Sequence, residues 1–236
     1  SAAATLSAGF TAGRHELHAV FWGNGDIVAR RSPMLEINAS GDTSLAAPSE
    51  LSVKLQYPDL AHLTWYPVAN ADLYIIERRT ASTEFVEIGT ENFYRSFNDP
   101  TVLPGTAYDY PIRAATADRA IVSQPSPLDY ITTFAWSDGS PSDPPKRVKA
   151  VHWTELRTAA NAVRALAGLP PFAWTDTSLT AKPIKHLHVT QLRTALDAAR
   201  SSLGPGPAAY ITDPTLESGV PVKARHLSEL HDAMKG

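Results

Sequence analysis

A block of ten residues occurs three times in the last third of the chain, and this repetition limits what that third can fold into. The copies span residues 148–157, 184–193 and 222–231. Each carries a histidine at its fifth position, so that His152, His188 and His226 lie 36 and then 38 residues apart. A period near this length is typical of stacked supersecondary units, none of which can bury its apolar face alone.

Each repeat unit predicts one amphipathic helix followed by a proline-rich return. In the first copy, five residues recur at the spacing that places side chains along one side of a helix. They are His152, Leu156, Ala159, Val163 and Leu166. We therefore divide residues 148–236 into three helical repeats, at 148–183, 184–221 and 222–236.

Turn and cap residues separate the predicted helices. Gly168 and Gly204 follow the first two helices and are expected to cap their C-termini. The pairs Thr175-Asp176 and Thr212-Asp213 are suited to a turn or a helix N-cap. The whole pattern resembles C-terminal helical repeats found behind Ig-like or fibronectin modules in large bacterial secreted proteins.

The middle of the chain contains short strand candidates separated by turn residues, a pattern typical of a β-sandwich. They lie at 51–53, 63–65, 73–78, 85–88, 108–114 and 128–132. Pro48, Trp65, Tyr74 and the segments 97–99 and 103–110 give residues 47–133 a resemblance to a fibronectin type III domain.

The fibronectin type III resemblance implies roles for two aromatic residues. Trp65 would be the core tryptophan of the second strand, and the Tyr108 hydroxyl would bond back to the preceding corner. Pro111 departs from the pattern, since proline donates no ladder hydrogen bond. We expect a bulge or a local break there.

The first 39 residues read as strands of another domain. Side chains alternate between two faces from Gly13 to Trp22, and the dense turn residues 23–26 follow. The stretch resembles the C-terminal part of a bacterial Ig-like repeat. Taken alone, such strands leave an open sheet edge. We therefore expect either that the polypeptide was cut from something larger or that another molecule completes this domain.

Two linkers complete the predicted architecture. Residues 40–46 are a linker by composition, and residues 134–147 form a second, proline-rich one. The predicted fold class is multidomain: an all-β part, made of partial Ig-like strands (1–39) and a fibronectin type III sandwich (47–133), followed by an all-α helical-repeat domain (148–236).

Composition excludes several classes of function. The chain has no cysteine, which rules out disulfides, cysteine-ligated zinc and thiol catalysis. The net charge of -3 does not indicate the basic surface that binding to nucleic acid requires. No apolar run reaches the length of a membrane span.

We predict an extracellular or cell-surface protein that binds other proteins or itself, while glycan binding stays open.

The recurring histidines His152, His188 and His226 are the main candidates for chemistry. One interpretation makes them metal or proton sites, since histidine is a common ligand and titrates near neutrality. The other places each imidazole on the core-facing stripe, bonded to a backbone carbonyl or to the aspartate of a neighbouring turn. Because no ligand cluster accompanies them in sequence, we favour the structural interpretation.

No residue pattern predicts catalysis, a cofactor or a metal site. The interaction candidates are Trp22, Trp65, Tyr108 and the three histidines. The leading hypothesis is a non-enzymatic structural or interaction protein of a bacterial surface. It could be a filament subunit assembled by strand addition at the Ig-like segment. The alternative is a non-catalytic accessory tail of a larger secreted enzyme or adhesin.

Overall fold

The computed structural model describes residues 44–57, 59–134, 136–137 and 148–236. Leu45–Gly236 forms one compact unit. The predicted Ig-like segment 1–39, with the candidate Trp22, lies outside the described residues.

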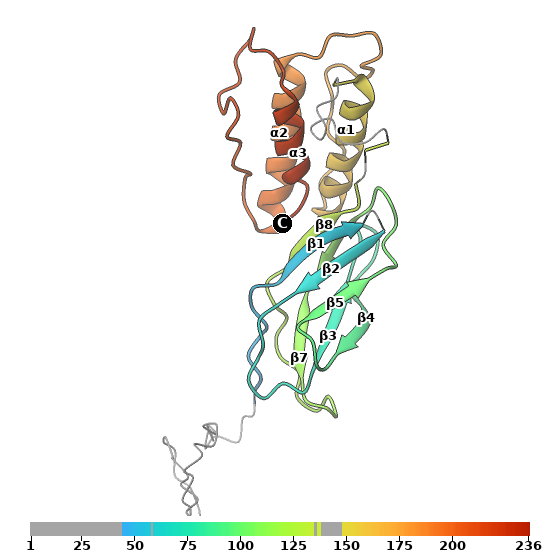
Figure 1. Cartoon of the computed structure of the whole chain (residues 1–236), viewed down its shortest axis with the longest axis vertical. Helices are drawn as coiled ribbons and strands as arrows, with labels where there is room; N and C mark the ends of the chain where they lie inside the picture. The colour runs from blue at the N-terminus through green and yellow to red at the C-terminus, as the bar shows by residue number, and fades with distance from the viewer. Residues whose placement is uncertain (1–43, 58, 135, 138–147) are drawn as a thin grey trace, which may run out of the picture. The chain divides into compact units, whose positions relative to one another are not determined.

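The first part of the compact unit is an antiparallel β-sandwich, as predicted (Figure 1). One sheet has the strand order β1-β2-β5, and a second has the order β4-β3-β7. Strands β6 and β8 pair with each other. The bounds are β1 (Ser52–Tyr57), β2 (Leu60–Thr64), β3 (Leu73–Arg78), β4 (Val86–Glu91), β5 (Ser96–Asp99), β6 (Ala107–Tyr110), β7 (Ile112–Ala115) and β8 (Asp129–Thr132).

Pro111 interrupts one long strand and leaves it as β6 and β7, which confirms the predicted break. Its carbonyl still accepts a hydrogen bond from the Glu77 N–H at 3.2 Å. Beyond the break, Arg79 and Asp109 exchange both backbone hydrogen bonds, at 3.0 and 3.1 Å. Strand β3 and Arg79, the residue that follows it, therefore pair with both halves of the interrupted strand.

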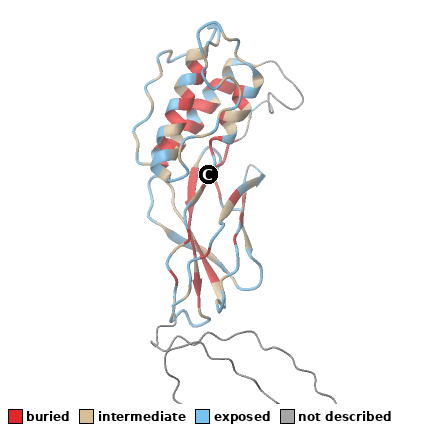
Figure 2. Cartoon of the chain, turned by 90° about the vertical axis from the view of Figure 1, so that its left-hand side faces the viewer, coloured by how far each residue is buried: buried red, intermediate tan, exposed pale blue. Residues whose placement is uncertain are grey.

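The sandwich core is built from alternating inward side chains of both sheets. Leu63, Ile76 and Ile112 are fully buried. Gly89 leaves room for one of the large rings, because a Cβ there would lie 2.7 Å from the Phe97 ring. Burial on strands and on the inward faces of the helices is visible in Figure 2.

The last third forms three helices, one in each predicted repeat (Figure 1). They are α1 (Ala150–Leu166), α2 (His186–Leu203) and α3 (Ala224–Asp232). Gly168 lies directly after the C-cap of α1 with φ +71°, and Gly204 is the C-cap of α2 with φ +113°. Both predicted C-terminal glycines are therefore confirmed.

Equivalent positions of the three helices pack into a single core. Leu156, Leu192 and Leu230 occupy one such position and are all fully buried. The same holds for the positions one turn earlier, which are Trp153, Val189 and Leu227. The repeats thus supply one shared interior rather than a series of interfaces.

The three repeats close on one another instead of forming an open stack. Helix α1 packs against both α2 and α3, and α2 also packs against α3. The Trp136 ring lies 5.3 Å from the His152 ring of α1 and 5.9 Å from the His231 ring of α3. The sequence predicts stacked units, and these contacts show that the first and third units also touch each other.

The chain end ties the helices to the sandwich. The Gly236 N–H donates to the Tyr130 carbonyl at 2.9 Å, and the Thr132 hydroxyl donates to the Met234 carbonyl at 2.9 Å. Tyr130 and Phe134 are buried in the same core as the helices. Strand β8 is therefore part of the helical core as well as of the sandwich.

Candidate functional site

The repeated histidine acts first as a helix cap. Nδ1 of His188 accepts the backbone N–H of Lys185, the N-cap residue of α2, at 3.1 Å. The same bond, at the same length, forms in α1 and α3. In each helix the histidine occupies the N3 position, where a glutamate or glutamine closes a capping box.

The other ring nitrogen binds the aspartate of the preceding turn. Nε2 of His188 donates to Oδ2 of Asp176 at 3.0 Å, and Nε2 of His226 donates to Oδ2 of Asp213 at 3.2 Å. Because Nδ1 accepts a backbone N–H, the proton of the neutral ring is on Nε2. Of the two predicted partners, a backbone carbonyl or the aspartate of a turn, the aspartate is the one bound by both histidines, and the other ring nitrogen accepts the N-cap N–H.

A lysine completes each of these two groups. Lys182 Nζ lies 2.5 Å from Asp176, and Lys223 Nζ lies 2.8 Å from Asp213. The hydrogen bond from Lys182, followed by that from His188, lowers the pKa of Asp176 to about 2. The hydrogen bond from Lys223 likewise lowers the pKa of Asp213. Both carboxylates are therefore held ionised.

The environment of His226 favours the neutral ring. Burial lowers the pKa of His226, and the nearby Arg193 guanidinium lowers it further, against the opposing effect of Asp213. The His226 ring is fully buried. A proton on Nδ1 would also displace the Lys223 N–H.

These contacts do not converge on one point. His188 and His226 each bind the aspartate of their own turn, and those turns belong to different repeats. Among the described residues, no group of three or more histidine, aspartate or glutamate side chains is placed to hold a metal ion.

A second set of side chains links each helix to the next turn. Arg157 Nη1 donates to the Asp176 carbonyl at 2.6 Å, and its guanidinium lies 4.7 Å from the centre of the Trp174 ring. In the next repeat Arg193 donates to the Asp213 carbonyl and lies 4.6 Å from the Tyr210 ring. Each turn is thus held from both sides, by its own helix and by the previous one.

The residue three positions after each histidine also binds a turn. Glu155 accepts the Ser137 N–H at 3.1 Å, and Glu229 accepts the Thr212 N–H at 2.8 Å. Gln191 donates to the Thr175 hydroxyl. The glutamine in the middle copy therefore binds a turn, as the glutamates do in the other two copies.

A turn that precedes α1 lies inside residues 134–147, the segment predicted as a linker. Phe134 is buried, and its ring lies 4.7 Å from that of Trp136. Phe172 and Trp174 have the same separation in the turn before α2. Sequence reasoning missed this turn, although residues 134–138 read Phe-Ala-Trp-Ser-Asp and residues 172–176 read Phe-Ala-Trp-Thr-Asp.

The two aromatic candidates of the sandwich are structural. Trp65 is 3% exposed and packs edge-on against Tyr74, with ring centres 5.2 Å apart. The buried Tyr108 hydroxyl accepts the Leu103 N–H at 2.8 Å, which confirms the predicted bond to the preceding corner. Neither ring is available to a ligand.

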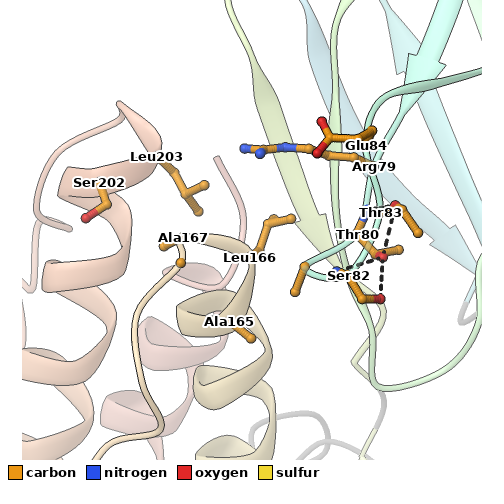
Figure 3. A pocket seen from close by; sticks show the side chains of 12 residues that line it. Arg79, Thr80, Ser82, Thr83, Glu84, Ala165, Leu166, Ala167, Ser202 and Leu203 are labelled. Atoms are coloured by element: carbon orange, nitrogen blue, oxygen red, sulfur yellow. Dashed lines mark hydrogen bonds between the residues drawn. The ribbon is translucent and has the colours of Figure 1, made fainter.

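A shallow cleft of about 490 Å³ lies between the β3–β4 loop and the C-terminal ends of α1 and α2 (Figure 3). Leu166 and Leu203 line its helical side. On the other side Arg79 is paired with Asp109 at 2.8 Å, and Thr80 bonds Thr83. These polar groups are thus used within the protein.

Within the described residues, no helix combines the length and the apolarity that crossing a bilayer requires.

Comparison with known proteins finds likenesses to solved structures only. No protein-family model matches the chain, and no curated protein matches it. A fibronectin type III-like protein from Clostridium thermocellum is 25% identical, with a TM-score of 0.33, over 36% of this chain and 90% of that one. The sixth fibronectin type III domain of a human fibronectin type III domain-containing protein is 13% identical, with a TM-score of 0.34, over 40% of this chain and 91% of that one. Pectate lyase PelI from Erwinia chrysanthemi is 21% identical, with a TM-score of 0.29, over 34% of this chain and 27% of that one.

Proposed function

We propose that the chain is a non-enzymatic structural or interaction protein of the bacterial surface or secreted space. The observation that carries the proposal is how the chemistry-bearing side chains are used. The imidazoles of His188 and His226, the carboxylates of Asp176 and Asp213, and the ammonium of Lys182 and Lys223 bind one another. Their polar atoms join turns to helices and face no common space.

The contact between sandwich and helices supports the same role. Hydrogen bonds from Gly236 to Tyr130 and from Thr132 to Met234 lie beside a shared apolar core. Such a junction transmits force and orientation from one module to the next, as a spacer or an assembly subunit requires. Modules joined only by a flexible linker move independently.

The proposal extends to self-assembly through residues 1–39. Their alternating pattern is that of a strand, and strand addition between copies is a heterologous contact that propagates without closing. The partner is then a second copy of this chain. Other protein partners on the same surface are an outcome of the test.

Light scattering of the purified chain over a range of concentrations, with electron microscopy of the same samples, tests assembly. The expected result is concentration-dependent growth that Leu17→Pro abolishes, because proline removes a ladder donor. Thr43→Pro, in the predicted linker, is the matched control. A monodisperse monomer at high concentration would exclude the filament. A hydrolase domain encoded upstream in the gene would instead favour the accessory-tail alternative.

A further inference from the structure

Buried polar atoms without partners lie where α1 and α2 meet the turn that contains Thr175 and Asp176. Arg157 is 6% exposed, and its Nη1 donates to the Asp176 carbonyl. Its Nε and Nη2 are buried without a hydrogen-bond partner among the described residues. The same is true of Oε1 of Gln191.

Both residues bind the same turn. Arg157 binds the carbonyl of Asp176, whereas Nε2 of Gln191 donates to the hydroxyl of Thr175, the neighbouring residue. The guanidinium supplies donors and the amide oxygen supplies an acceptor. A buried donor or acceptor left unpaired in this way is costly and needs a partner.

The next junction repeats the arrangement with a different acceptor. There Arg193 binds the Asp213 carbonyl, and Glu229 stands where the previous repeat has Gln191. The distance from Arg193 Nη2 to Glu229 Oε2 is 3.7 Å, too long for a direct hydrogen bond. Arg193 Nε and Glu229 Oε2 are also buried without a partner among the described residues.

We propose that each of these two junctions binds one internal water molecule. The water accepts a hydrogen bond from the guanidinium of Arg157 or Arg193 and donates one to Gln191 or Glu229. Buried waters in proteins take such positions, bridging polar groups that cannot reach each other.

Water fits both junctions better than an ion. An anion only accepts hydrogen bonds, so it would leave Gln191 Oε1 unpaired and would be repelled by the Glu229 carboxylate. A cation would be repelled by the single guanidinium of its junction, Arg157 or Arg193. Water alone can satisfy a donor and an acceptor at the same site.

A high-resolution crystal structure of the full chain tests the proposal. We expect one density peak at each junction, within hydrogen-bonding distance of the guanidinium and of Gln191 or Glu229, that shows no anomalous signal after a bromide soak. An anomalous peak would make the site an anion site. The absence of a peak, or direct contact between Arg157 and Gln191, would overturn the proposal.

Variants at one junction separate a bound water from a merely structural glutamine. Gln191→Met keeps the length of the side chain but removes its acceptor, so the first peak should disappear, the second should remain, and the Tm should fall by several degrees. Gln191→Glu keeps an acceptor and should keep the peak. Gln56→Met, at an exposed position of β1, is the control and should leave both peaks and the Tm unchanged. A first peak that persists in Gln191→Met would contradict the assignment.

Discussion

His188 and Asp176 are joined by a 3.0 Å hydrogen bond that ties the first turn of α2 to a residue twelve positions earlier. The same imidazole accepts the N-cap N–H of its own helix. One buried side chain therefore both starts the helix and places the turn before it. The stability of the repeats should depend strongly on this residue.

Replacing His188 by alanine should lower the free energy of unfolding by about 2–3 kcal/mol, because it removes the cap and leaves a cavity. His188→Gln should lose less, since a glutamine at N3 can still accept the N-cap N–H. Urea unfolding of each variant measures the difference. His186→Ala, two residues earlier and only half-buried, is the control. Equal losses in His186→Ala and His188→Ala would contradict the capping role.

Stability should decrease as the pH falls below about 6.5, the usual pKa of histidine. Burial lowers the pKa of both His226 and His231 in the folded protein. On acidification the unfolded chain therefore takes up these protons before the folded protein does, which favours unfolding. Above this pH both states are neutral and the contribution is complete. Unfolding free energies measured from about pH 8 to pH 5 should show the decline, and His226→Gln should make it shallower.

A second loss should follow at lower pH, from the ion-paired aspartates. The pKa of Asp176 is lowered to about 2 by Lys182 and His188, against about 3.9 in an unfolded chain. Its contribution is thus present above about pH 4 and is lost as the pH falls towards 2. Asp176→Asn should remove this part of the acid transition. Acid titrations of the two proteins that superimpose below pH 4 would show that Asp176 does not contribute.

Tyr108→Phe should destabilise the protein by about 1 kcal/mol, because the Leu103 N–H loses its hydrogen-bond acceptor. Tyr66→Phe removes the same hydroxyl from a ring that is 63% exposed and should have little effect. Thermal unfolding of both variants provides the comparison. A larger shift for Tyr66→Phe would contradict the assignment of Tyr108 to the corner.

Arg200→Ala should weaken the junction between the sandwich and the helices. Arg200 Nη1 donates to the Tyr130 hydroxyl at 3.1 Å and to the Ala233 carbonyl at 3.2 Å, and Nε donates to the Gly206 carbonyl at 3.0 Å. We expect a loss on the order of 2–3 kcal/mol and a broadened or divided unfolding transition in calorimetry. Arg225→Ala, on the exposed side of α3, is the matched control. A single sharp transition at an unchanged temperature in Arg200→Ala would contradict this role.

Features set by neighbouring residues could be predicted from the sequence. Pro111 breaks its strand because it lacks an N–H, and Gly204 ends α2 because glycine accepts a positive φ. The capping role of the histidines could also have been predicted, because Lys185 and His188 have the spacing of an N-cap residue and an N3 acceptor. Local chemistry was sufficient in each case.

Contacts between distant segments could not be predicted in this way. The contact between the Trp136 and His231 rings joins the turn before α1 to α3. No local sequence pattern distinguishes such closure from an open stack. The bond from Gly236 to Tyr130 depends in turn on where that closed core lies against β8. Both follow from how three short apolar faces share one interior.

Closure of the helices also fixes how many repeats the module can have. An open array can gain or lose a unit at either end by duplication or deletion, because each unit interacts only with its neighbours. Here a fourth unit would have to add next to α3, at the position where Trp136, from the turn before α1, lies against His231. Change in this part of the protein therefore has to proceed by substitution within three units rather than by a change in their number.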